Sequence, residues 1–576
     1  MQVHTLKELI EKIPFVRYQE DRYGLAMPFY QQRTPQLTNA LQVYINDRSL
    51  SSALTLNILR SYGELDLGFI DHVEIYLGLP SLDFGIENAA FVIKLYTKKG
   101  YRENTSFASA SIGSAGSNDF YFYDAKGSQE RNYLAFVSST KLKRSTNYHK
   151  NKAFSKDDEN SHLYYEYNYK NHRFEFEYLQ NSKDAFLGES LGFDSLHPTL
   201  EGYLLYGGWY YEDSSIKAFA NYTTIHTRYK DRSNPSPLGY LFTPHGIQPY
   251  RSFDANINDQ IANLHLSYKY DSNNYHSKTG LQYRFKGFHF DNVKLDSHPV
   301  NADKSFDQEH ILSIFHESDL LPQESSLVSL ALKADRYIHN GNIADYTVYS
   351  SRLGYLYNDE KWTIKTYGMY KESIPSIYSL YKNAFIFHQR NKIDKTKGYA
   401  IGGRISYHHQ HQKIALLLSR TWINRGLIYK RTPRGIQVSN TKSTPIYDAI
   451  DLSYINRLDG IDYLRADLWA MYCYLRGSTK RSYGALLGWG NEWGKWSIYN
   501  DFTYKRYYSS EGLNANVALR YRYSHKCSFT LKATNIFGTA ITENYISFDP
   551  LSGQISQVKD VRLFDRRVWI GIEWLF

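Results

Sequence analysis

Apolar and polar residues alternate along most of the chain after about residue 106. In 260–270, Leu264, Leu266, Tyr268 and Tyr270 share one face. The intervening positions carry His265, Ser267 and Lys269. The segments 463–476 and 516–523 repeat this pattern. Alternation with a period of two residues predicts β-strands that have one apolar and one polar face.

Short and long connections alternate between these predicted strands. The short ones are turn-sized: 170–173, 212–215, 271–274, 358–361, 458–460 and 492–495. The long ones are polar: 141–162, 228–259, 291–308, 374–397, 425–445 and 540–564. Aromatic residues crowd the short-turn ends, at 208–215, 355–362 and 488–496. Such a girdle with long loops opposite is typical of a transmembrane β-barrel, and the alternation yields about 22 strands, the even number that single-chain barrels require.

A soluble β-propeller is the other fold with this many strands. It requires a recurring blade signature with a period of roughly 40 residues. The sequence contains no such repeat. We therefore predict an antiparallel, 22-stranded transmembrane β-barrel over residues 102–576.

The last predicted strand reaches the end of the chain. In 566–576 the residues Val568, Ile570, Ile572, Trp574 and Phe576 share one face. Trp569, Gly571, Glu573 and Leu575 share the other. An open strand edge inside hydrocarbon leaves backbone groups unsatisfied. We therefore expect this strand to pair with the first barrel strand and close the cylinder.

Residues 1–101 lack the alternating rhythm and predict a small mixed α/β domain. We expect a helix at 5–12, strands at 41–47, 72–78 and 91–100, and a further helix at 58–66.

Several short motifs occur in this segment in a fixed order. They are "LKELIEKIPFV" (6–16), Arg33, "LQVYINDRSL" (41–50) and "LDLGFIDHVEIYLGLPSLDFGIENAAFVIKLYTKKG" (65–100). This series resembles the plug domain of TonB-dependent outer-membrane receptors. The closing stretches "LKATNIFGTAITENY" (531–545) and "DRRVWIGIEWLF" (565–576) resemble the last two strands of that family. The resemblance implies a plug domain at 1–101 inside the barrel lumen, and it implies that Arg33 helps to seat the plug.

The chain departs from the family pattern at three turns. The family's Arg-Gly is Arg33-Thr34 here, its Asp-Gly is Asn46-Asp47, and its Gly-Pro is interrupted as Gly78-Leu79-Pro80. Loss of a glycine removes a residue that adopts positive φ without strain. We expect these turns to differ locally from those of the family.

The chain begins inside the resembling region. Its first residues, "MQVHTLKELIEKIPFV", do not form a signal peptide. Either an upstream N-terminus carries the secretion signal and the segment that contacts the energy-coupling protein, or this copy cannot be energised. Because such a barrel has no role in cytosol, we favour the first interpretation.

Composition narrows the possible partners. The net charge is +10, but Lys and Arg are scattered along the strands and form no dense stripe. This pattern argues against nucleic acid. An anionic ligand, an anionic membrane surface and plain solvation of the strands all remain possible. The 54 tyrosines suit the water–lipid boundary.

Sequence motifs for chemistry are sparse. There is no nucleophile elbow, P-loop or HExxH pattern, and the 2 cysteines form neither a disulfide framework nor a zinc signature. We therefore expect no enzyme, no cofactor and no metal site. The one metal-like cluster, "HHQHQ" (408–412), lies on a predicted short turn and lacks a carboxylate or Cys to complete a tetrahedral set. We interpret it as a polar turn.

Charged residues on the polar strand faces are candidates for the interface between plug and barrel. Arg465, Asp467, Arg520 and Arg522 are predicted to point into the lumen. Charges inside a protein are tolerated when they are paired or wet. We expect these four to pair with plug charges, and Arg33 is the matching candidate on the plug.

Ligand contacts are expected at the outward tips of the plug (22–29, 48–62 and 82–88) and in two long loops. The first loop contributes Tyr240, Phe242, His245, Tyr250 and Arg251. The second contributes Tyr378, Tyr381, Phe385, Phe387, His388 and Arg390. Aromatic and Arg groups suit bulky, anionic, conjugated ligands such as metal chelates. Packing among the loops is the alternative role for each residue.

Taken with the family resemblance, these features predict energised uptake of a scarce, large nutrient across the outer membrane of a Gram-negative bacterium. The nutrient would be a metal chelate such as a siderophore–iron complex or cobalamin. The expected partners are this ligand, a TonB-type inner-membrane coupling protein and outer-membrane lipid. Two alternatives remain: a passive porin-like channel, and a surface-binding relic of the family that no longer transports.

Overall fold

The computed structural model describes most of the chain, and the structural statements below concern the residues it describes. These are 3–26, 29–30, 41–53, 63–77, 91–243, 246–300, 307–341, 343–375, 380, 393–432, 435–457, 463–475, 478–507, 510–549 and 551–576.

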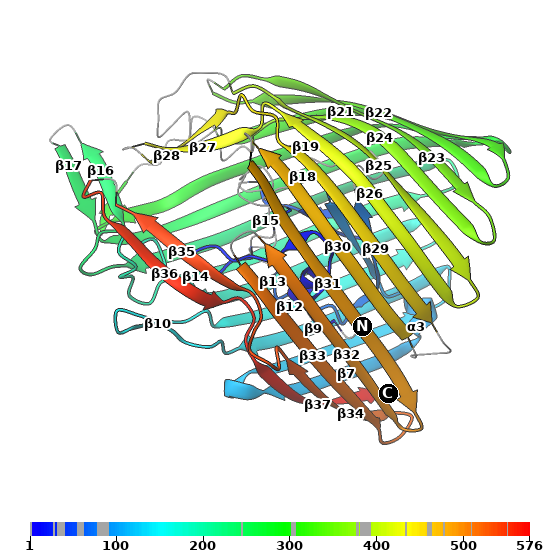
Figure 1. Ribbon diagram of the computed structural model, residues 1–576, viewed down its shortest axis with the longest axis horizontal. Coiled ribbons are helices and arrows are strands. Elements are labelled where there is room, and N and C mark those ends of the chain that lie inside the picture. The colour runs from blue at the N-terminus through cyan, green and yellow to red at the C-terminus, as the bar shows by residue number, and fades with distance from the viewer. Residues whose placement is uncertain are drawn as a thin grey trace.

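Residues from Thr105 onward form a closed antiparallel barrel of 22 spanning strands (Figure 1). The first half consists of β7 (Thr105–Gly113), β8 (Asn118–Gly127), β9 (Arg131–Leu142), β12 (Asp158–Tyr169), β13 (His172–Asp184), β14 (Thr199–Glu212), β15 (Ile216–Arg232), β18 (Ser252–Asp271), β19 (Tyr275–Leu295), β21 (Gln308–Gln323) and β22 (Ser326–His339). The second half consists of β23 (Tyr346–Asn358), β24 (Trp362–Ser373), β25 (Thr396–His409), β26 (Gln412–Asn424), β29 (Ile446–Arg457), β30 (Tyr463–Leu475), β31 (Ser478–Trp493), β32 (Trp496–Tyr507), β33 (Ser510–Arg522), β34 (Cys527–Thr534) and β37 (Arg567–Leu575). A two-residue strand, β20 (His298–Pro299), pairs with the end of β19. The predicted fold class is confirmed.

The C-terminal strand closes the cylinder. On one side β37 pairs with β34, and on the other it pairs with the first barrel strand, β7. Ile570 lies opposite Ile112, and Ile572 lies opposite Ala110. The expected pairing of the last strand with the first is confirmed.

The alternation along each strand separates an outer from an inner face. On β18, Leu266 and Tyr268 are 56% and 57% exposed, whereas the neighbouring His265 and Ser267 are 5% and 2% exposed. On β37, Val568, Ile570 and Trp574 are exposed. A continuous exposed apolar face around a closed barrel is stable only against lipid.

No helix among the described residues is both long enough and apolar enough to cross a membrane.

The two ends of the barrel differ as the connection lengths predict. One end has tight turns, such as that between His409 and Gln412. The other end, at the left in Figure 1, carries four extra hairpins. These are β10 (Asn147–His149) with β11 (Lys152–Phe154), β16 (Gly239–Thr243) with β17 (Gly246–Tyr250), β27 (Leu427–Thr432) with β28 (Gly435–Asn440), and β35 (Thr542–Phe548) with β36 (Ile555–Arg562).

Several predicted loop boundaries were wrong. The connection predicted at 228–259 is shorter, because β15 continues to Arg232 and β18 begins at Ser252. The connection predicted at 540–564 contains β35 and β36. A strand that leaves the membrane can become polar on both faces while its backbone hydrogen bonds continue. A stretch that is polar on both faces therefore shows where a strand leaves the membrane. It does not show where the strand ends.

The N-terminal segment forms a small mixed α/β unit. It contains α1 (Leu6–Glu11), β1 (Val16–Arg17), β2 (Phe29–Tyr30), β3 (Leu41–Ile45), β4 (Arg48–Leu50), β5 (Ile70–Leu77), β6 (Phe91–Thr97) and α3 (Gly100–Glu103). The Thr5 hydroxyl caps α1 by accepting a hydrogen bond from the Glu8 amide at 3.3 Å. Four strands form one sheet in the order β4-β3-β6-β5, in which β3 and β6 are parallel.

Most predicted elements of this segment are confirmed, with one exception. The predicted helix at 58–66 is wrong where it is described, because 63–66 form a turn and Asp66 bridges to Thr5. Gly63 in this stretch disfavours a helix. Residues 58–62 lie outside the described part of the chain.

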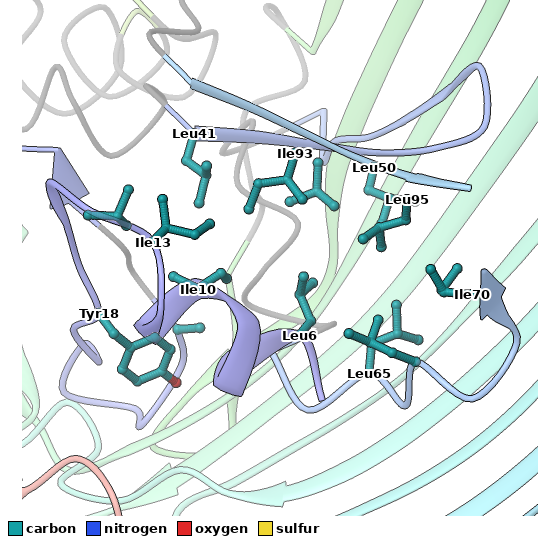
Figure 2. Packing of buried hydrophobic residues seen from close by; sticks show 14 of the residues in the cluster. Leu6, Ile10, Ile13, Tyr18, Leu41, Leu50, Leu65, Ile70, Ile93 and Leu95 are labelled. Atoms are coloured by element: carbon teal, nitrogen blue, oxygen red, sulfur yellow. The ribbon is translucent and has the colours of Figure 1, made fainter. Parts of the chain in front are cut away.

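The N-terminal segment and the barrel share one hydrophobic core. In Figure 2, Leu6 and Ile10 of α1 lie beneath Ile93 and Leu95 of the sheet. The same cluster continues onto inward-facing barrel residues, including Phe136, Tyr164, Trp469 and Tyr507. Phe15 packs edge-on against Trp469, with ring centroids 5.5 Å apart. A barrel of this size requires such a filling, because 22 strands enclose far more space than their own side chains occupy.

Candidate functional site

The N-terminal segment contacts well-separated strands of the closed sheet. Lys12 reaches Asp501 on β32, at 2.7 Å between Nζ and Oδ2. Ser52 donates to Asp259 on β18 at 2.6 Å. Arg48 pairs with Glu177 on β13. Contacts with such distant parts of one closed sheet require the segment to lie inside the lumen.

The hairpin between β3 and β4 is held against the wall formed by β12 to β15. Asn46 donates to Glu175 at 2.9 Å and to Glu166 at 3.2 Å. The Asp47 carboxylate pairs with Arg173 at 2.8 Å and with Lys217 at 2.9 Å. Burial alone would raise the pKa of Asp47, but Lys217, Arg173 and Lys94 hold this pKa well below its usual range.

The adjacent Arg48 is fully enclosed by the same wall. Its guanidinium pairs with Glu177 and lies 3.9 Å from the centroid of the Tyr206 ring. Glu177 also contacts His162 at 2.7 Å. A buried arginine is tolerable only with such compensation, because an unpaired buried charge is strongly destabilising.

The turn at Asn46-Asp47, where the family pattern has Asp-Gly, has a local explanation. Asn46 adopts the left-handed conformation with a φ of 51°. Asparagine tolerates this region far better than most residues with a Cβ. The turn therefore keeps a positive φ without glycine and gains two polar side chains that bind the barrel wall. The other two departures, at 33–34 and 78–80, lie outside the described residues.

A second contact region centres on Glu20, whose carboxylate is fully buried. It accepts from Lys7 at 3.0 Å, from Arg144 at 2.9 Å and from Lys156 at 2.6 Å. Arg144 also pairs with Asp565 at 2.7 Å. This cluster, called the Glu20 cluster below, ties the N-terminal segment to two long connections at the hairpin-bearing end of the barrel.

The charge balance of the Glu20 cluster favours ionised Glu20. Burial alone would raise the pKa of its carboxyl, but Arg144, Lys156 and Lys7 hold this pKa well below its usual range. A depressed carboxyl pKa gives stability that is complete above the unfolded value of about 4.3 and is lost as the pH falls through the folded value. The cluster is therefore intact throughout the neutral and mildly acidic range.

A third contact region lies where α1 faces β34. The Lys532 Nζ binds both carboxylate oxygens of Glu8, at 2.7 and 2.8 Å. Burial alone would raise the pKa of Glu8, but Lys532 lowers it to about 2. Close by, Asp66 accepts at Oδ1 from the Gly68 amide at 2.7 Å. Its buried Oδ2 has no hydrogen-bond partner among the described residues.

Asp66 yields a pH-dependent prediction. Burial and the neighbouring Asp119 raise the pKa of Asp66 well above its usual range. Stability from a raised carboxyl pKa is complete below about pH 4 and is lost as the pH rises towards the folded pKa. We expect Asp66→Asn to stabilise the protein at pH 8 by about 1–3 kcal/mol, the usual cost of an unsatisfied buried group, and to have little effect at pH 4.

Urea titrations of the detergent-solubilised protein at both pH values measure this difference. Asp71→Asn is the matched control, because Asp71 is exposed and pairs only with the exposed His72 among the described contacts. If the wild-type protein is more stable than Asp66→Asn at pH 8, the raised pKa of Asp66 is contradicted.

The predicted interface residues of the barrel pair with other barrel residues. Arg465 pairs with Asp467 two positions along β30, at 2.5 Å. Arg520 pairs with Glu573 at 2.9 Å, and Arg522 pairs with Glu492 at 2.6 Å. Among the described residues, the ion pairs of these four residues thus stay within the barrel wall. Arg33 lies outside the described residues.

The predicted ligand residues that are described lie at the hairpin-bearing end. Tyr240, on β16, donates to Asp549 at 3.0 Å and so joins two loop hairpins. Tyr250 ends β17, and the backbone amide of the exposed Arg251 donates to Asp296 at 2.8 Å. Outside the described side chains lie Phe242, His245, Tyr378, Tyr381, Phe385, Phe387, His388 and Arg390.

The histidine-rich segment 408–412 forms the tight turn between β25 and β26. His408 lies 3.2 Å from the Thr363 hydroxyl on the neighbouring strand. In the described part of the chain, no three His, Cys, Asp or Glu residues are arranged to hold a metal ion.

Sequence reasoning missed the residues that make the observed contacts. Asn46 and Asp47 were visible only as a departure from a family motif. Arg48 was expected at an outward tip of the plug, but it is buried and pairs with Glu177 on the barrel wall. Glu20 and Lys532 carried no signal, because the barrel partner Arg144 of Glu20 lies 124 residues away along the chain and the partner Glu8 of Lys532 lies 524 residues away. Buried charges can be paired only after the strand topology is known, because the topology decides which distant residues lie close together.

Solved structures of other proteins share the fold of this chain over its whole length. The chain superposes on the copper transporter OprC with a TM-score of 0.77 and 12% identity, covering 100% of this chain and 96% of that chain. The FrpB iron transporter from Neisseria meningitidis (F5-1 variant) gives a TM-score of 0.70 at 12% identity, covering 100% and 97%. A double mutant of the ferric enterobactin receptor PfeA from Pseudomonas aeruginosa gives 0.71 at 12% identity, covering 100% and 96%.

Neither a family model nor a curated protein matches the sequence.

The fold therefore defines a plugged transmembrane β-barrel, with a lumen filled by the N-terminal segment. It is the fold of the TonB-dependent receptors that the sequence motifs resemble.

Proposed function

We propose that this protein is a TonB-dependent outer-membrane receptor of a Gram-negative bacterium and that it imports a metal chelate. In this proposal residues 1–101 form the plug domain and 102–576 form the transmembrane barrel. The chelate would be a siderophore–iron complex, cobalamin or a comparable copper or iron complex. The protein acts as a transporter and catalyses no reaction.

One observation carries the proposal: the lumen is blocked by a unit tied to several walls at once. Lys12 binds Asp501 on β32, Ser52 binds Asp259 on β18, and the Asn46–Arg48 hairpin binds β12 to β15. A channel for passive diffusion gains nothing from such a filling, whereas an importer of scarce solutes requires a closed resting state. The names of the structural neighbours, which are transporters of copper, iron and ferric enterobactin, support the same class of solute.

The proposed ligand surface includes three described residues, Tyr240, Tyr250 and Arg251, at the hairpin-bearing end. It comprises Tyr240, Phe242, His245, Tyr250 and Arg251 in one connection and Tyr378, Tyr381, Phe387, His388 and Arg390 in another. Aromatic rings and guanidinium groups bind flat anionic chelates by stacking and bidentate hydrogen bonds. Arg33 is proposed to seat the plug, facing the polar inner wall that includes Arg465, Asp467, Arg520 and Arg522.

The proposed partners follow from this mechanism. A TonB-type inner-membrane protein supplies the energy that rearranges the plug, and outer-membrane lipid surrounds the barrel. Nucleic acid has no part in it.

Uptake by metal-starved cells tests the proposal. Deletion of the gene is expected to reduce the accumulation of one chelate in a panel of radiolabelled iron, copper and cobalt complexes, and the intact gene is expected to restore it. Unchanged accumulation across the whole panel would reject the proposal.

The deletion strain also tests the ligand surface. Complementation with Arg251→Ala is expected to raise the concentration needed for half-maximal uptake by roughly tenfold, the effect of losing one charge-assisted contact. Arg228→Ala is the matched control, because Arg228 is exposed on β15 and pairs with Asp254. If both variants reach half-maximal uptake at the same concentration, Arg251 does not contact the ligand.

A passive channel is the second candidate. It predicts steady conductance of the purified wild-type protein in planar bilayers, whereas the blocked lumen predicts little.

A further inference from the structure

A polar cavity runs along the inside of the seam where the barrel closes. Its volume is about 110 Å³. On one side lies α1 of the plug, and on the other lie β34, β37 and β7. The cavity extends from Asp565 and Arg567, at the hairpin-bearing end, to Glu573 near the last turn of the chain.

Small inward-facing residues create this gap. On β7 they are Ser109 and Ser111, on β34 Thr530, and on β37 Gly571. A Cβ at position 571 would come within 2.7 Å of the Thr530 hydroxyl and 3.1 Å of Ser111 Cβ, so the wall itself is tightly packed here. The space left by these short side chains lies between the wall and the plug.

The wall three and four strands further along, at β12 and β13, is different. On β12 and β13, the inward-facing side chains of Tyr164, Glu166 and Glu177 are fully buried, because the β3–β4 hairpin covers them. At the seam, Ser109, Ser111 and Thr530 are only partly buried. The plug is therefore packed firmly against β12 and β13 and loosely at the seam.

One ion pair crosses the cavity at the seam itself. Lys532, on β34, holds both oxygens of Glu8, which lies in the first turn of α1. The His4 amide donates to the same carboxylate at 2.9 Å. The next contacts of α1 lie to one side, on β32 and β33: Lys12 with Asp501, and Asn514 with Glu11.

We propose that this seam cavity is the route by which solute passes the plug, and that the Glu8–Lys532 ion pair is the latch that keeps it closed. This inference rests on the proposed transport function and specifies its path. Breaking this bidentate pair releases α1 from β34, while β12 to β15 keep their contacts with the plug. The opened route is lined by the carboxylates of Glu8, Glu11, Asp66, Asp119 and Glu573. In a conductance measurement, such a lining makes small-ion currents through the opened seam selective for cations.

Conductance of the purified full chain in planar bilayers tests the latch. We expect Lys532→Gln to increase the open fraction roughly tenfold over wild type, as loss of a charge-assisted bidentate contact implies, and to give cation-selective currents. Glu8→Gln should act in the same direction. The charge exchange Glu8→Lys with Lys532→Glu should restore low conductance.

Lys217→Gln is the matched control. It removes the same charge from a barrel lysine on β15, six strands from β7, that pairs with a plug carboxylate, Asp47. Asp47 keeps Arg173, so we expect conductance close to that of wild type. Equal currents from Lys217→Gln and Lys532→Gln, or silence of Lys532→Gln, would overturn the latch.

Cysteine labelling separates an opened seam from a lost plug. In a chain with Cys473 and Cys527 replaced by serine, Thr530→Cys and Ser111→Cys report on the seam. Ser267→Cys reports on the inward face of β18, where Ser267 is buried. In the Lys532→Gln background we expect a water-soluble thiol reagent to modify positions 530 and 111 at least tenfold faster than before, and position 267 to stay protected. Rapid modification of position 267 would mean that the whole plug leaves, and would reject the seam as the route.

These measurements need neither cargo nor a coupling protein. Seam currents together with a negative uptake panel would reject import and keep the route. Chelate uptake together with a silent Lys532→Gln would reject the latch and keep import.

Discussion

Glu20→Gln is expected to lower the free energy of unfolding by about 3–5 kcal/mol, because removal of one partner leaves buried charges uncompensated. Glu20 binds Lys7, Arg144 and Lys156, all of them buried. Glutamine keeps the shape of the side chain and removes only the charge. Urea titration followed by hydrogen exchange in residues 3–26 measures the effect where the plug docks.

Glu159→Gln is the control for this substitution. Glu159 pairs with Lys141 on the exposed surface of the barrel, where ion pairs contribute at most about 1 kcal/mol. Similar losses for the two variants would mean that the Glu20 cluster contributes no more than a surface pair. Because the pKa of Glu20 is depressed, we also expect the difference between wild type and Glu20→Gln to persist from pH 8 to pH 5 and to shrink only in stronger acid.

Ile570→Arg is expected to destabilise the folded protein in lipid by about 2–4 kcal/mol, the cost of a cation near the middle of the lipid-facing surface of a barrel. Ile570 lies on β37 and is 66% exposed. Ile555 is also 66% exposed but lies on the loop hairpin β35–β36. The two positions therefore differ in their surroundings and match in exposure.

Folding titrations in phospholipid vesicles compare Ile570→Arg with Ile555→Arg. We expect the second change to cost less than about 1 kcal/mol, as surface substitutions do. Equal losses at the two positions would mean that β37 does not face lipid.

The barrel could be predicted because the two faces of each strand meet different environments, which fixes the alternation of apolar and polar residues. Leu264 to Tyr270 alternate with polar residues because one face meets lipid and the other meets a polar interior, and this rule applies to every strand. The closing strand followed from the same rule. The strand ends did not, since β15 and β18 continue as polar strands beyond the membrane.

The contacts between plug and wall could not be predicted in the same way. Arg465, Asp467, Arg520 and Arg522 were expected to pair with plug charges, but their ion pairs among the described residues are with barrel neighbours. Arg144 and Lys156 lie in polar connections that resemble any solvated loop, yet both are buried against Glu20. Such burial depends on how the plug sits in the lumen, which alternation along single strands does not encode.

The most direct test of the closed barrel is a disulfide across its seam. Ala110 and Ile572 are cross-strand partners on β7 and β37. Antiparallel partners lie about 4.5–5.5 Å apart at Cα, within the range that a disulfide spans. In membranes from cells that express the Ala110→Cys/Ile572→Cys chain without its native cysteines, we expect nearly complete intramolecular cross-linking. Ala110→Cys with Phe529→Cys, two strands apart at roughly 10 Å, should give none. Absence of the first cross-link, or equal yields from both pairs, would contradict a cylinder closed by the last strand against the first.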